Sequence, residues 1–462
     1  MKPLYNLKAN TAMSKLADVL VIGSGSAGAV AAISAAQSKY KVMLIERLGF
    51  AGGTSTQMLD TFYGFFTPGE NARKIVGGIP DWVVNRLNKS GEVFLRPNTY
   101  GAGTGVNYNP ERLKSVWDEM FMAHGVEVIY HSTLVGIEPY GEQQKCLFFH
   151  KGIGIFEVIA KRVIDATGDA DYCHWKGHAY EKAGEKEAAQ SLTTTFRMAN
   201  VDLDKFEKAG GKKMLKEQMQ VAVESGRHPL PRKEGSAHEM NVFGCVSTVA
   251  VKVAGHDPLD PQSMSSAEIE GRRQAFVFEA FFRDMVAGYE NAKIIGLSTQ
   301  IGVRETRRVY GKYRLSMDDF NQRRQFEDQI LICGAPVEDH RSTPDGGAET
   351  YWKYVPDYGV YGVPYGCIVP EKSEMDWVVG RCFSATHQAH ASCRSMAQTM
   401  SMGQAAGQAA VLSLDQDTDA WGINKADLSN RLLKLGAVLE MPQERAQMER
   451  NSWSKNKLSN ES

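Results

Sequence analysis

The sequence predicts an α/β fold in which parallel strands alternate with helices. Residues 18–46, "DVLVIGSGSAGAVAAISAAQSKYKVMLIE", have the pattern of a buried strand, a glycine-rich turn, an alanine-rich helix and a second strand. Two later apolar strand candidates, residues 162–165 and 377–379, lead into turns that contain glycine. The length of 462 residues exceeds one ordinary core, so we expect a second, inserted domain.

The glycine-rich turn carries the strongest local signal. Gly23 permits a tight turn, Gly25 lets the backbone approach a pyrophosphate, and Gly28 allows the helix to pack closely on the strand. The N-terminus of the helix then faces the anion. Glu46 ends the second strand, where its carboxylate can accept hydrogen bonds from a ribose hydroxyl. These residues predict a dinucleotide site, and they leave NAD and FAD both open.

Composition excludes several classes of partner. The 53 Lys and Arg residues are balanced by 54 Asp and Glu residues, so no basic surplus is available to neutralise a nucleic acid. The seven cysteines are scattered and form no CxxC pair, which argues against a disulfide framework and against a metal site. The opening residues show no export signal, and no apolar run approaches the roughly 18 residues of a membrane span. We therefore expect a cytoplasmic protein without a nucleic-acid or membrane partner.

Three further segments suit a nucleotide. Residues 47–57, "RLGFAGGTSTQ", place a glycine pair and hydroxyl side chains where a loop can approach a phosphate or a ring, although a flexible turn would look the same. Residues 166–169, "ATGD", form a turn of small residues. The stretch "SMAQTMSMGQAAGQAAVLSL" predicts a helix whose small residues pack on the sheet. Its N-terminus, near Ser395, offers N–H groups to the N1–C2=O region of a reduced flavin.

The sequence resembles the FAD-dependent oxidoreductase family with the glutathione-reductase-type flavin fold. The resemblance rests on "ERLGFAGGTST", "VIDATGDAD", "GVRETRRVYGKYRLSMDDF" and "YGVPYGCIVP", followed by "VVGRCFSATHQAHASCRSMAQTMSMGQAAGQAA". It points to a broad bacterial branch that is distantly similar to fumarate reductase and ketosteroid dehydrogenase flavoproteins. It implies FAD as the cofactor and a Rossmann-like FAD-binding domain with an inserted α+β substrate domain.

The resemblance also implies individual contacts with FAD. The implied sets are Gly23, Gly25 and Gly28 at the pyrophosphate, Glu46 at the ribose, Arg47 near the adenine, Gly53 and Thr54 on the isoalloxazine side, Ala166, Gly168 and Asp169 on the adenosine side, and Gly380, Arg381, Ser395 and Met396 at the pyrophosphate and flavin edge. Many relatives carry glycine where this chain has Ala170, a small change that does not exclude FAD. Many also lack the histidine and the cysteine that this chain has as His390 and Cys393, so the resemblance implies no chemistry for these two residues.

The middle of the chain divides the predicted cofactor domain. The predicted parts are residues 1–185 and 370–462 for the FAD-binding domain and residues 186–369 for the substrate domain. Within the insert, strand candidates flank a charged helical segment at residues 204–226. A capping box starting at Ser265 precedes a long amphipathic stretch, whose aromatic residues we expect in the core.

Residues 384–396, "SATHQAHASCRSM", concentrate the candidates for catalysis. A histidine can take a hydroxyl proton as a hydride leaves, and an arginine can hold a carboxylate or an oxyanion. The hypothesis is that His387 is the acid or base and Arg394 an electrostatic clamp, with His390 as a second candidate. It is equally open that both histidines are structural or help to hold FAD. Arg304 is a candidate for binding or positioning an anionic substrate, although its segment could also form a solvated strand face.

These observations predict an FAD-dependent dehydrogenase or reductase that transfers a hydride between the flavin N5 and a small polar organic substrate. The reaction would interconvert an alcohol and a carbonyl, or act across a C–C bond. A flavin monooxygenase is a second possibility, although the GD motif typical of such enzymes is absent at Gly380–Arg381. A flavoprotein with a non-redox role, such as a lyase or hydratase, and an NAD enzyme without a flavin also stay open. The electron acceptor and the oligomeric state are not predicted by the sequence.

Overall fold

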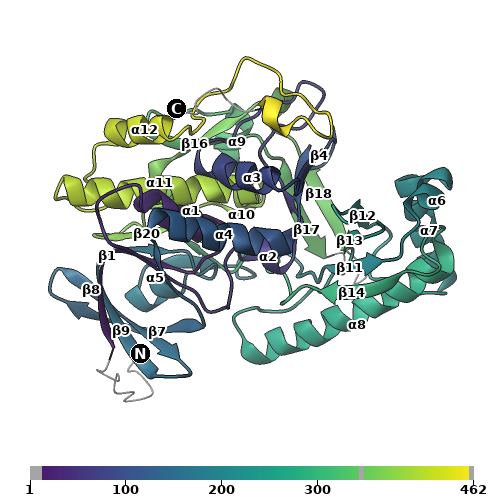
Figure 1. The fold of residues 1–462 in the computed structure, drawn as a ribbon, viewed down its shortest axis with the longest axis horizontal. Helices are drawn as coiled ribbons and strands as arrows, with labels where there is room; N and C mark the ends of the chain where they lie inside the picture. Colours follow the sequence, from purple (N-terminus) through teal and green to yellow (C-terminus); the bar gives the residue numbers. More distant parts are fainter. Residues whose placement is uncertain (1–12, 343–347, 457–462) are drawn as a thin grey trace.

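The computed structural model describes residues 13–342 and 348–456 (Figure 1). Residues 1–12 lie outside the described part. The expectation that the chain has no export signal rests on these residues. The largest sheet has seven strands, in which parallel pairs are extended by an antiparallel meander. The strands pair in the order β6 (Glu127–Ile129), β2 (Val42–Ile45), β1 (Ser14–Ile22), β9 (Gly154–Asp165), β8 (Gln143–His150) and β7 (Ser132–Tyr140), and β20 (Asp376–Val378) also pairs with β9.

The strand β1 lies in the middle of the parallel part of this sheet. It pairs in parallel with β2 on one side and with β9 on the other. Residues 19–22 are buried, as expected of an apolar run covered on both faces of the sheet. The helix α1 (Ser26–Ala35) connects β1 to β2 and is buried along its whole length. The βαβ unit predicted for residues 18–46 is therefore confirmed.

The helix α11 (Met396–Asp415) packs directly against α1. A Cβ atom at Gly403 would lie 2.0 Å from the Ala27 carbonyl oxygen, and one at Gly407 would lie 2.5 Å from the Ala31 carbonyl oxygen. No larger residue fits at these two points, so glycine is what allows the two helix backbones to approach this closely. The predicted helix and the packing role of its small residues are confirmed.

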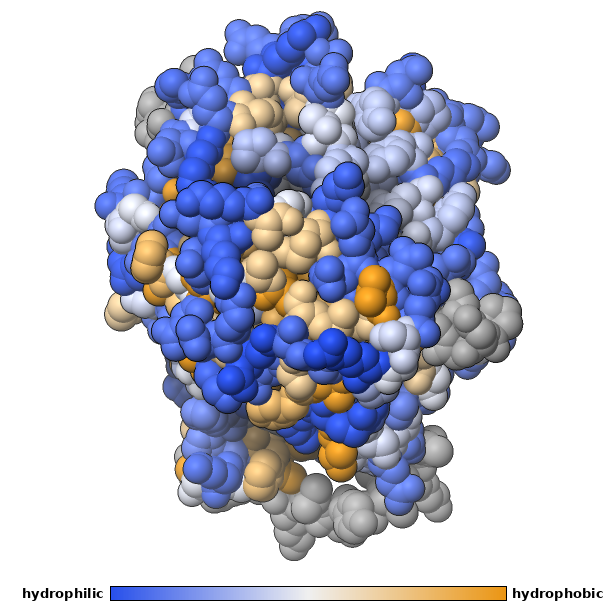
Figure 2. Space-filling view, turned by 90° about the vertical axis from the view of Figure 1, so that its right-hand side faces the viewer, coloured by the Kyte–Doolittle hydropathy of each residue, from blue (hydrophilic) through white to orange (hydrophobic). Residues whose placement is uncertain are grey.

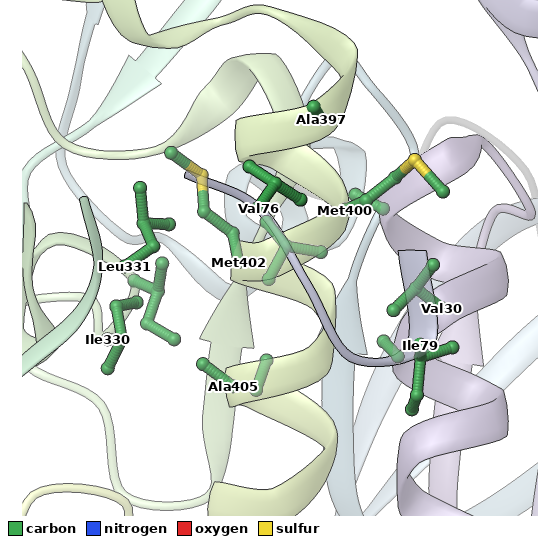
Figure 3. Packing of buried hydrophobic residues seen from close by; sticks show 14 of the residues in the cluster. Val30, Val76, Ile79, Ile330, Leu331, Ala397, Met400, Met402 and Ala405 are labelled. Atoms are coloured by element: carbon green, nitrogen blue, oxygen red, sulfur yellow. The ribbon is translucent and has the colours of Figure 1, made fainter. Parts of the chain in front are cut away.

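The same helix organises the main core (Figure 3). Leu331 of β16 (Gln329–Cys333) lies on one side of α11, and Val30 of α1 and Ile79 lie on the other. All three side chains are buried in one apolar cluster. Segments from the beginning and the end of the chain therefore share a single core.

A smaller antiparallel sheet lies at the right of Figure 1. Its strands pair in the order β12 (Ser236–Glu239), β13 (Val246–Val249), β11 (Phe196–Ala199) and β14 (Lys293–Leu297). The helix α8 (Pro261–Met285) packs on this sheet. Its Phe278 and Phe282 approach Phe196 of β11, with ring centroids 6.2 and 6.4 Å away. Phe278, Phe281 and Phe282 thus contribute to the core, as the sequence predicts, whereas Phe276 is exposed, so the prediction fails for that residue.

The start of α8 differs from the prediction. Asp260 caps the helix, and its Oδ1 accepts a hydrogen bond from the Ser263 backbone N–H at 2.7 Å. Pro261 takes the first helical position, where no intrahelical N–H bond is needed. Ser265 lies inside the helix and its hydroxyl donates to the Pro261 carbonyl at 2.7 Å. The capping box predicted at Ser265 is therefore wrong.

The remaining elements surround these two sheets. In chain order they are α2 (Thr54–Gln57), β3 (Thr61–Phe62), α3 (Ile79–Lys89), β4 (Val93–Arg96), β5 (Gly105–Tyr108), α4 (Pro110–His124), α5 (Asp171–Lys176), β10 (Tyr180–Lys182), α6 (Leu203–Lys208), α7 (Gly211–Ser225), β15 (Arg307–Val309), α9 (Met317–Gln322), β17 (Val337–Ser342), β18 (Ala348–Lys353), β19 (Tyr361–Pro364), α10 (His387–Cys393) and α12 (Lys425–Lys434). The strands β17 and β18 form an antiparallel pair, as do β16 and β19.

Apolar side chains gather in clusters that follow the two sheets. Alternate residues of β1 point to opposite faces, so that Val19 and Val21 join the main cluster and Leu20 and Ile22 join a cluster with β8 and β9. A further cluster is built from residues 192–301, around the small sheet and α8. The domain boundaries at residues 185 and 369 stay predictions.

Figure 2 shows the face of the molecule on the side of the small sheet. This face is largely hydrophilic, with apolar side chains gathered near its middle. Within residues 13–342 and 348–456, no helix has the length and apolar character needed to cross a bilayer.

Candidate active site

A cavity of about 820 Å³ joins the nucleotide-binding turn to the small sheet. Its walls include the residues that follow the carboxyl ends of β1, β2 and β9, which is where open parallel sheets place their ligands. The start of α11 contributes to the same wall. Further residues come from β13, β17 and β18. The topology thus brings the predicted cofactor segments and part of the inserted segment to one cavity.

All but one of the residues predicted to contact the cofactor line this cavity. Those that do are Gly23, Gly25, Glu46, Arg47, Gly53, Thr54, Ala166, Gly168, Asp169, Gly380, Arg381, Ser395 and Met396. Gly28 does not, because it faces the protein: a Cβ atom there would lie 2.0 Å from the Gly23 carbonyl oxygen and 2.7 Å from the Ala166 Cβ. Gly28 therefore serves the close packing of α1 on the sheet.

The turn after β1 fits a bound diphosphate. Gly23 has a φ of +93°, and a Cβ atom there would lie 2.4 Å from the Ala166 carbonyl oxygen. A Cβ atom at Gly25 would meet no atom within 4 Å. No side chain caps α1, and its first residues, Ser26 and Ala27, line the cavity. Open space and an uncapped helix N-terminus with its partial positive charge together make an anion site.

Glu46 is held rigidly at the end of β2. Its Oε2 accepts hydrogen bonds from the backbone N–H and the hydroxyl of Ser24, at 2.7 and 2.8 Å. Its Oε1 accepts from the backbone N–H of Leu48 at 2.9 Å. The carboxylate is thus fixed beside the turn, in the place where the motif positions an acid for a ribose hydroxyl.

The loop after Glu46 packs on the first turn. The Gly52 backbone N–H donates to the Ser24 carbonyl oxygen at 2.8 Å. Gly53 has a φ of +54°, and a Cβ atom there would lie 2.8 Å from the Gly25 Cα. The contact between these two backbones places Thr54, the first residue of α2, at the cavity wall.

Asp169 and Arg381 join two segments that are distant in sequence. The Nη2 of Arg381 donates to the Asp169 Oδ1 at 2.7 Å, and the Thr306 hydroxyl donates to the same oxygen at 3.0 Å. Burial opposes ionisation of this carboxyl, but the charge and the hydrogen bond of Arg381 outweigh it and lower the pKa of Asp169. Both side chains therefore stay charged at the cavity wall at neutral pH.

The start of α11 gives the cavity a second helix N-terminus. Ser395 is its N-cap residue, and no side chain caps the helix. Ser395 and Met396 both line the cavity. Two helix N-termini thus point their free N–H groups at one space, which suits a long cofactor with a diphosphate and an electron-accepting ring. The residues present therefore fit FAD.

His387 lies in a buried ion-pair network and is not among the residues that line the cavity. Its Nδ1 is 3.1 Å from the Glu305 Oε2, and its Nε2 is 3.3 Å from the Asp339 Oδ1. Burial alone would lower the pKa of His387, but these two carboxylates raise it to about 9. The structure therefore makes His387 an imidazolium that pairs with two acids, with neither ring nitrogen free for a substrate.

The segment around Arg304 is not a solvated strand face. Arg308 is buried and bridges two buried acids: its Nη1 is 2.7 Å from the Glu305 Oε2 and its Nη2 is 2.5 Å from the Glu181 Oε1. The solvated face considered for this segment is therefore wrong: Arg304 lines the cavity, and the charge of Arg308 is compensated by buried acids rather than by water.

His390 is also buried away from the cavity lining. Its Nε2–H donates to the Arg381 carbonyl oxygen at 2.7 Å, and its ring stacks on Phe383. Burial lowers the pKa of His390 to about 3, so the ring is neutral. Its contacts hold the Arg381 backbone, which is a structural role of the kind that the sequence left open for this residue.

Arg304 and Arg394 both line the cavity. Arg304 donates from Nη1 to the Ser191 carbonyl oxygen at 2.5 Å. Arg394 donates from Nη2 to the Gln190 Oε1 and to the Glu338 carbonyl oxygen, both at 3.0 Å. The structure therefore brings together the two arginines that the sequence singled out.

Sequence reasoning missed the cavity residues of the insert. They include Arg232, Glu234, His238, Glu338, His340, Thr350 and Trp352. One signal was present in "VEDHRS", the sequence of β17, because alternate residues of a strand face opposite sides. Glu338 and His340 line the cavity, whereas Asp339 contacts His387 on the other side.

The described residues form no metal-binding cluster. Among those residues, no group of three His, Cys, Asp or Glu side chains is placed to hold a metal ion.

Comparisons with known proteins establish the family of this chain. Solved structures that match this chain in part include p-nitrophenol 4-monooxygenase PnpA from Pseudomonas putida DLL-E4 (11% identity, 92% of this chain and 85% of that chain, TM-score 0.48). Another is a geranylgeranyl bacteriochlorophyll reductase-like protein from Thermoplasma acidophilum (13% identity, 96% of this chain and 96% of that chain, TM-score 0.46). A third is OxyS anhydrotetracycline hydroxylase from Streptomyces rimosus (10% identity, 91% of this chain and 66% of that chain, TM-score 0.46). No curated protein sequence matches at a significant level. Residues 18–432 match the family described as FAD dependent oxidoreductase, so the chain belongs to this family of oxidoreductases and FAD is its cofactor.

Proposed function

We propose that this enzyme transfers a hydride between the flavin N5 and a small polar organic substrate, either between an alcohol and a carbonyl or across a C–C bond. The observation that supports this is that the cavity continues beyond the cofactor-binding residues. We call its other part the substrate lobe; it is lined by Arg232, Glu234, His238, Arg304, Glu338, His340, Thr350 and Arg394. Arg394 directly precedes Ser395, so the lobe adjoins the cofactor-binding wall at α11.

When bound, FAD supplies the acceptor or donor of the hydride. The chain must then hold the substrate, exclude water and move one proton. Aromatic side chains of Tyr63, Trp352 and Tyr354 line the cavity and would help to exclude water once the substrate is bound. Arg304 and Arg394 hold the polar substrate.

We assign the proton transfer to His340, because it lines the cavity and His387 does not. The His340 Nε2 is 3.2 Å from the Glu338 Oε1, and its Nδ1 is 3.2 Å from the Thr350 hydroxyl oxygen. Burial, followed by the charge of Arg304, lowers the pKa of His340 to about 3, so the ring is neutral at pH 7. A neutral ring whose Nε2–H donates to Glu338 leaves Nδ1 as the acceptor. A substrate proton can then pass through the Thr350 hydroxyl to this nitrogen.

Anaerobic titration of the purified holoenzyme tests the reaction type. The bound cofactor is first released with acid and identified by mass; flavin that stays in the pellet would show covalent attachment. Alcohols, hydroxy acids and enoates are then added without a nicotinamide. Bleaching by one of them supports hydride transfer with that substrate. Bleaching by NADH or NADPH alone, with hydroxylation of an organic substrate in air, would instead establish a monooxygenase. If no organic compound or nicotinamide bleaches the flavin, a non-redox role is favoured.

We expect His340→Gln to slow substrate-dependent bleaching by about 100-fold or more, because a general acid or base contributes roughly that much. The FAD content should stay at the wild-type level, since the residue is not in the cofactor-binding wall. Stopped-flow absorbance measures both. His256→Gln is the matched control: this histidine contacts the Ala254 carbonyl and does not line the cavity. A wild-type rate in His340→Gln would refute the assignment.

A further inference from the structure

Three arginines from separate segments line the substrate lobe. Arg232 precedes β12, Arg304 lies between β14 and β15, and Arg394 lies between α10 and α11. They are close enough to repel one another. Burial lowers the pKa of Arg304, and the charges of Arg394 and Arg232 lower it further, to about 9. The fold therefore gathers like charges that ordinary packing would keep apart.

The acceptors in contact with these guanidinium groups are mostly neutral. Arg304 donates to the Ser191 carbonyl, and Arg394 donates to a side-chain amide oxygen and a carbonyl. Within the described part of the chain, neither forms a salt bridge with a carboxylate. Arg232 does pair, with the Glu234 Oε1 at 3.1 Å. The Nε atoms of Arg232 and Arg394 are buried without a hydrogen-bond partner. Donor capacity and positive charge are thus left over in the lobe.

The titratable groups that share the lobe do not cancel this charge. Glu338 and Glu234 are the two carboxylates that line it. The pKa of Glu338 is lowered to about 2, although burial opposes this, so it stays ionised and leaves three cations facing two anions. Burial lowers the pKa values of His238 and His340, so both rings are neutral. A site with one surplus positive charge and unused N–H donors favours a singly charged anion over a phosphate dianion.

We propose that the substrate is a small carboxylate, and that Arg232, Arg304 and Arg394 form the site that binds its carboxylate group. This rests on the proposed function, in which the lobe holds the substrate. A guanidinium donates two parallel N–H bonds to a carboxylate, so Arg304 and Arg394 can fix the orientation of the molecule as well as attract it. The bound anion also offsets the charge of Arg304 at His340, which strengthens His340 as a proton acceptor once substrate is present.

Flavin difference spectra of the holoenzyme test the proposal. The probes are acetate, propanoate and benzoate, with benzamide as the neutral match of benzoate, inorganic phosphate as the competing anion and sodium chloride as the ionic-strength control. We expect at least one carboxylate to give a saturable perturbation, and any response to benzamide to be at least about tenfold weaker than to benzoate. A yellow protein that responds to none of the three carboxylates would overturn the carboxylate site. A preference for inorganic phosphate would also overturn it.

Variants of Arg304 and Arg394 test whether these arginines cause the spectral response to carboxylates. Arg304→Gln should weaken the best carboxylate at least about tenfold, and Arg304→Lys should recover part of the loss because it keeps the charge. The matched control is Arg227→Gln, an exposed arginine that pairs with Asp284 on the surface. Flavin content and the thermal midpoint of each variant show whether it is folded; if Arg304→Gln does not fold, Arg304→Lys and Arg394→Gln carry the test. Unchanged carboxylate binding in the folded variants would overturn the proposal. A holoenzyme whose flavin no substrate reduces would contradict only the proposed hydride transfer.

Discussion

Gly25→Val is expected to abolish FAD binding while the apoprotein stays folded. Gly25 has φ −54° and ψ 170°, a conformation that valine adopts, and a Cβ atom there meets no protein atom within 4 Å. The open side is the cavity in front of α1, where the backbone must approach the pyrophosphate. We expect the dissociation constant for FAD to rise at least about 100-fold, or about 2.7 kcal/mol, with less than about 1 kcal/mol change in apoprotein stability.

Fluorescence titration with FAD and urea unfolding of the apoprotein measure the two effects separately. Gly296→Val is the matched control, since a Cβ atom there also meets nothing and the residue lies outside the cavity. Gly28→Val should do the reverse and disrupt the fold, because its Cβ would lie 2.0 Å from the Gly23 carbonyl oxygen. Stoichiometric FAD in purified Gly25→Val would show that the cofactor lies elsewhere.

His387→Asn is expected to lower the free energy of unfolding by about 3 kcal/mol at pH 6.5 or below. The pKa of His387 is raised from 6.5 to about 9 by Asp339 and Glu305 against the opposing effect of burial, and each pKa unit corresponds to about 1.4 kcal/mol. Because the folded protein holds this proton more tightly than the unfolded chain, the contribution is complete below pH 6.5. It is lost as the pH rises from 6.5 through 9.

Urea unfolding of wild type and variant across pH 6 to 10 checks this, because the difference between the two curves cancels the contributions of groups that titrate in both proteins. The difference should shrink as the pH rises toward about 9 and beyond. His228→Asn is the control: its partner Asp284 is exposed, so removal should cost less than about 1 kcal/mol at any pH. A difference that does not vary with pH would show that His387 is not an imidazolium in the folded protein.

The cofactor half of the site was predictable because its signals are local. Gly23, Gly25, Gly28 and Glu46 belong to one strand–turn–helix–strand unit, in which residues close in sequence are also close in space. The small residues of α11 likewise carry their packing role in their spacing, which puts Gly403 and Gly407 on one helix face. The backbone conformation of each segment follows from its own residues.

The role of His387 was not predictable in the same way. The density of polar groups in residues 384–396 suggested catalysis, but the partners that determine the pKa of His387 are Glu305 and Asp339, on distant segments of the chain. The residues that flank a histidine do not show whether its ring meets solvent, a substrate or two carboxylates.

By itself, the sequence determined the dinucleotide-binding unit and the close packing of α1 and α11, because both depend on short-range spacing of glycines and apolar residues. The family followed from the resemblance of several longer motifs. Only the tertiary structure decided which charged side chains meet in the substrate lobe. Arg232, Arg304, His340 and Arg394 come from four segments, and Glu338 and His340 face the lobe only because the opposite face of β17 packs toward His387. Which face of a charged strand is turned inward depends on long-range packing and ion pairing, which no local pattern encodes.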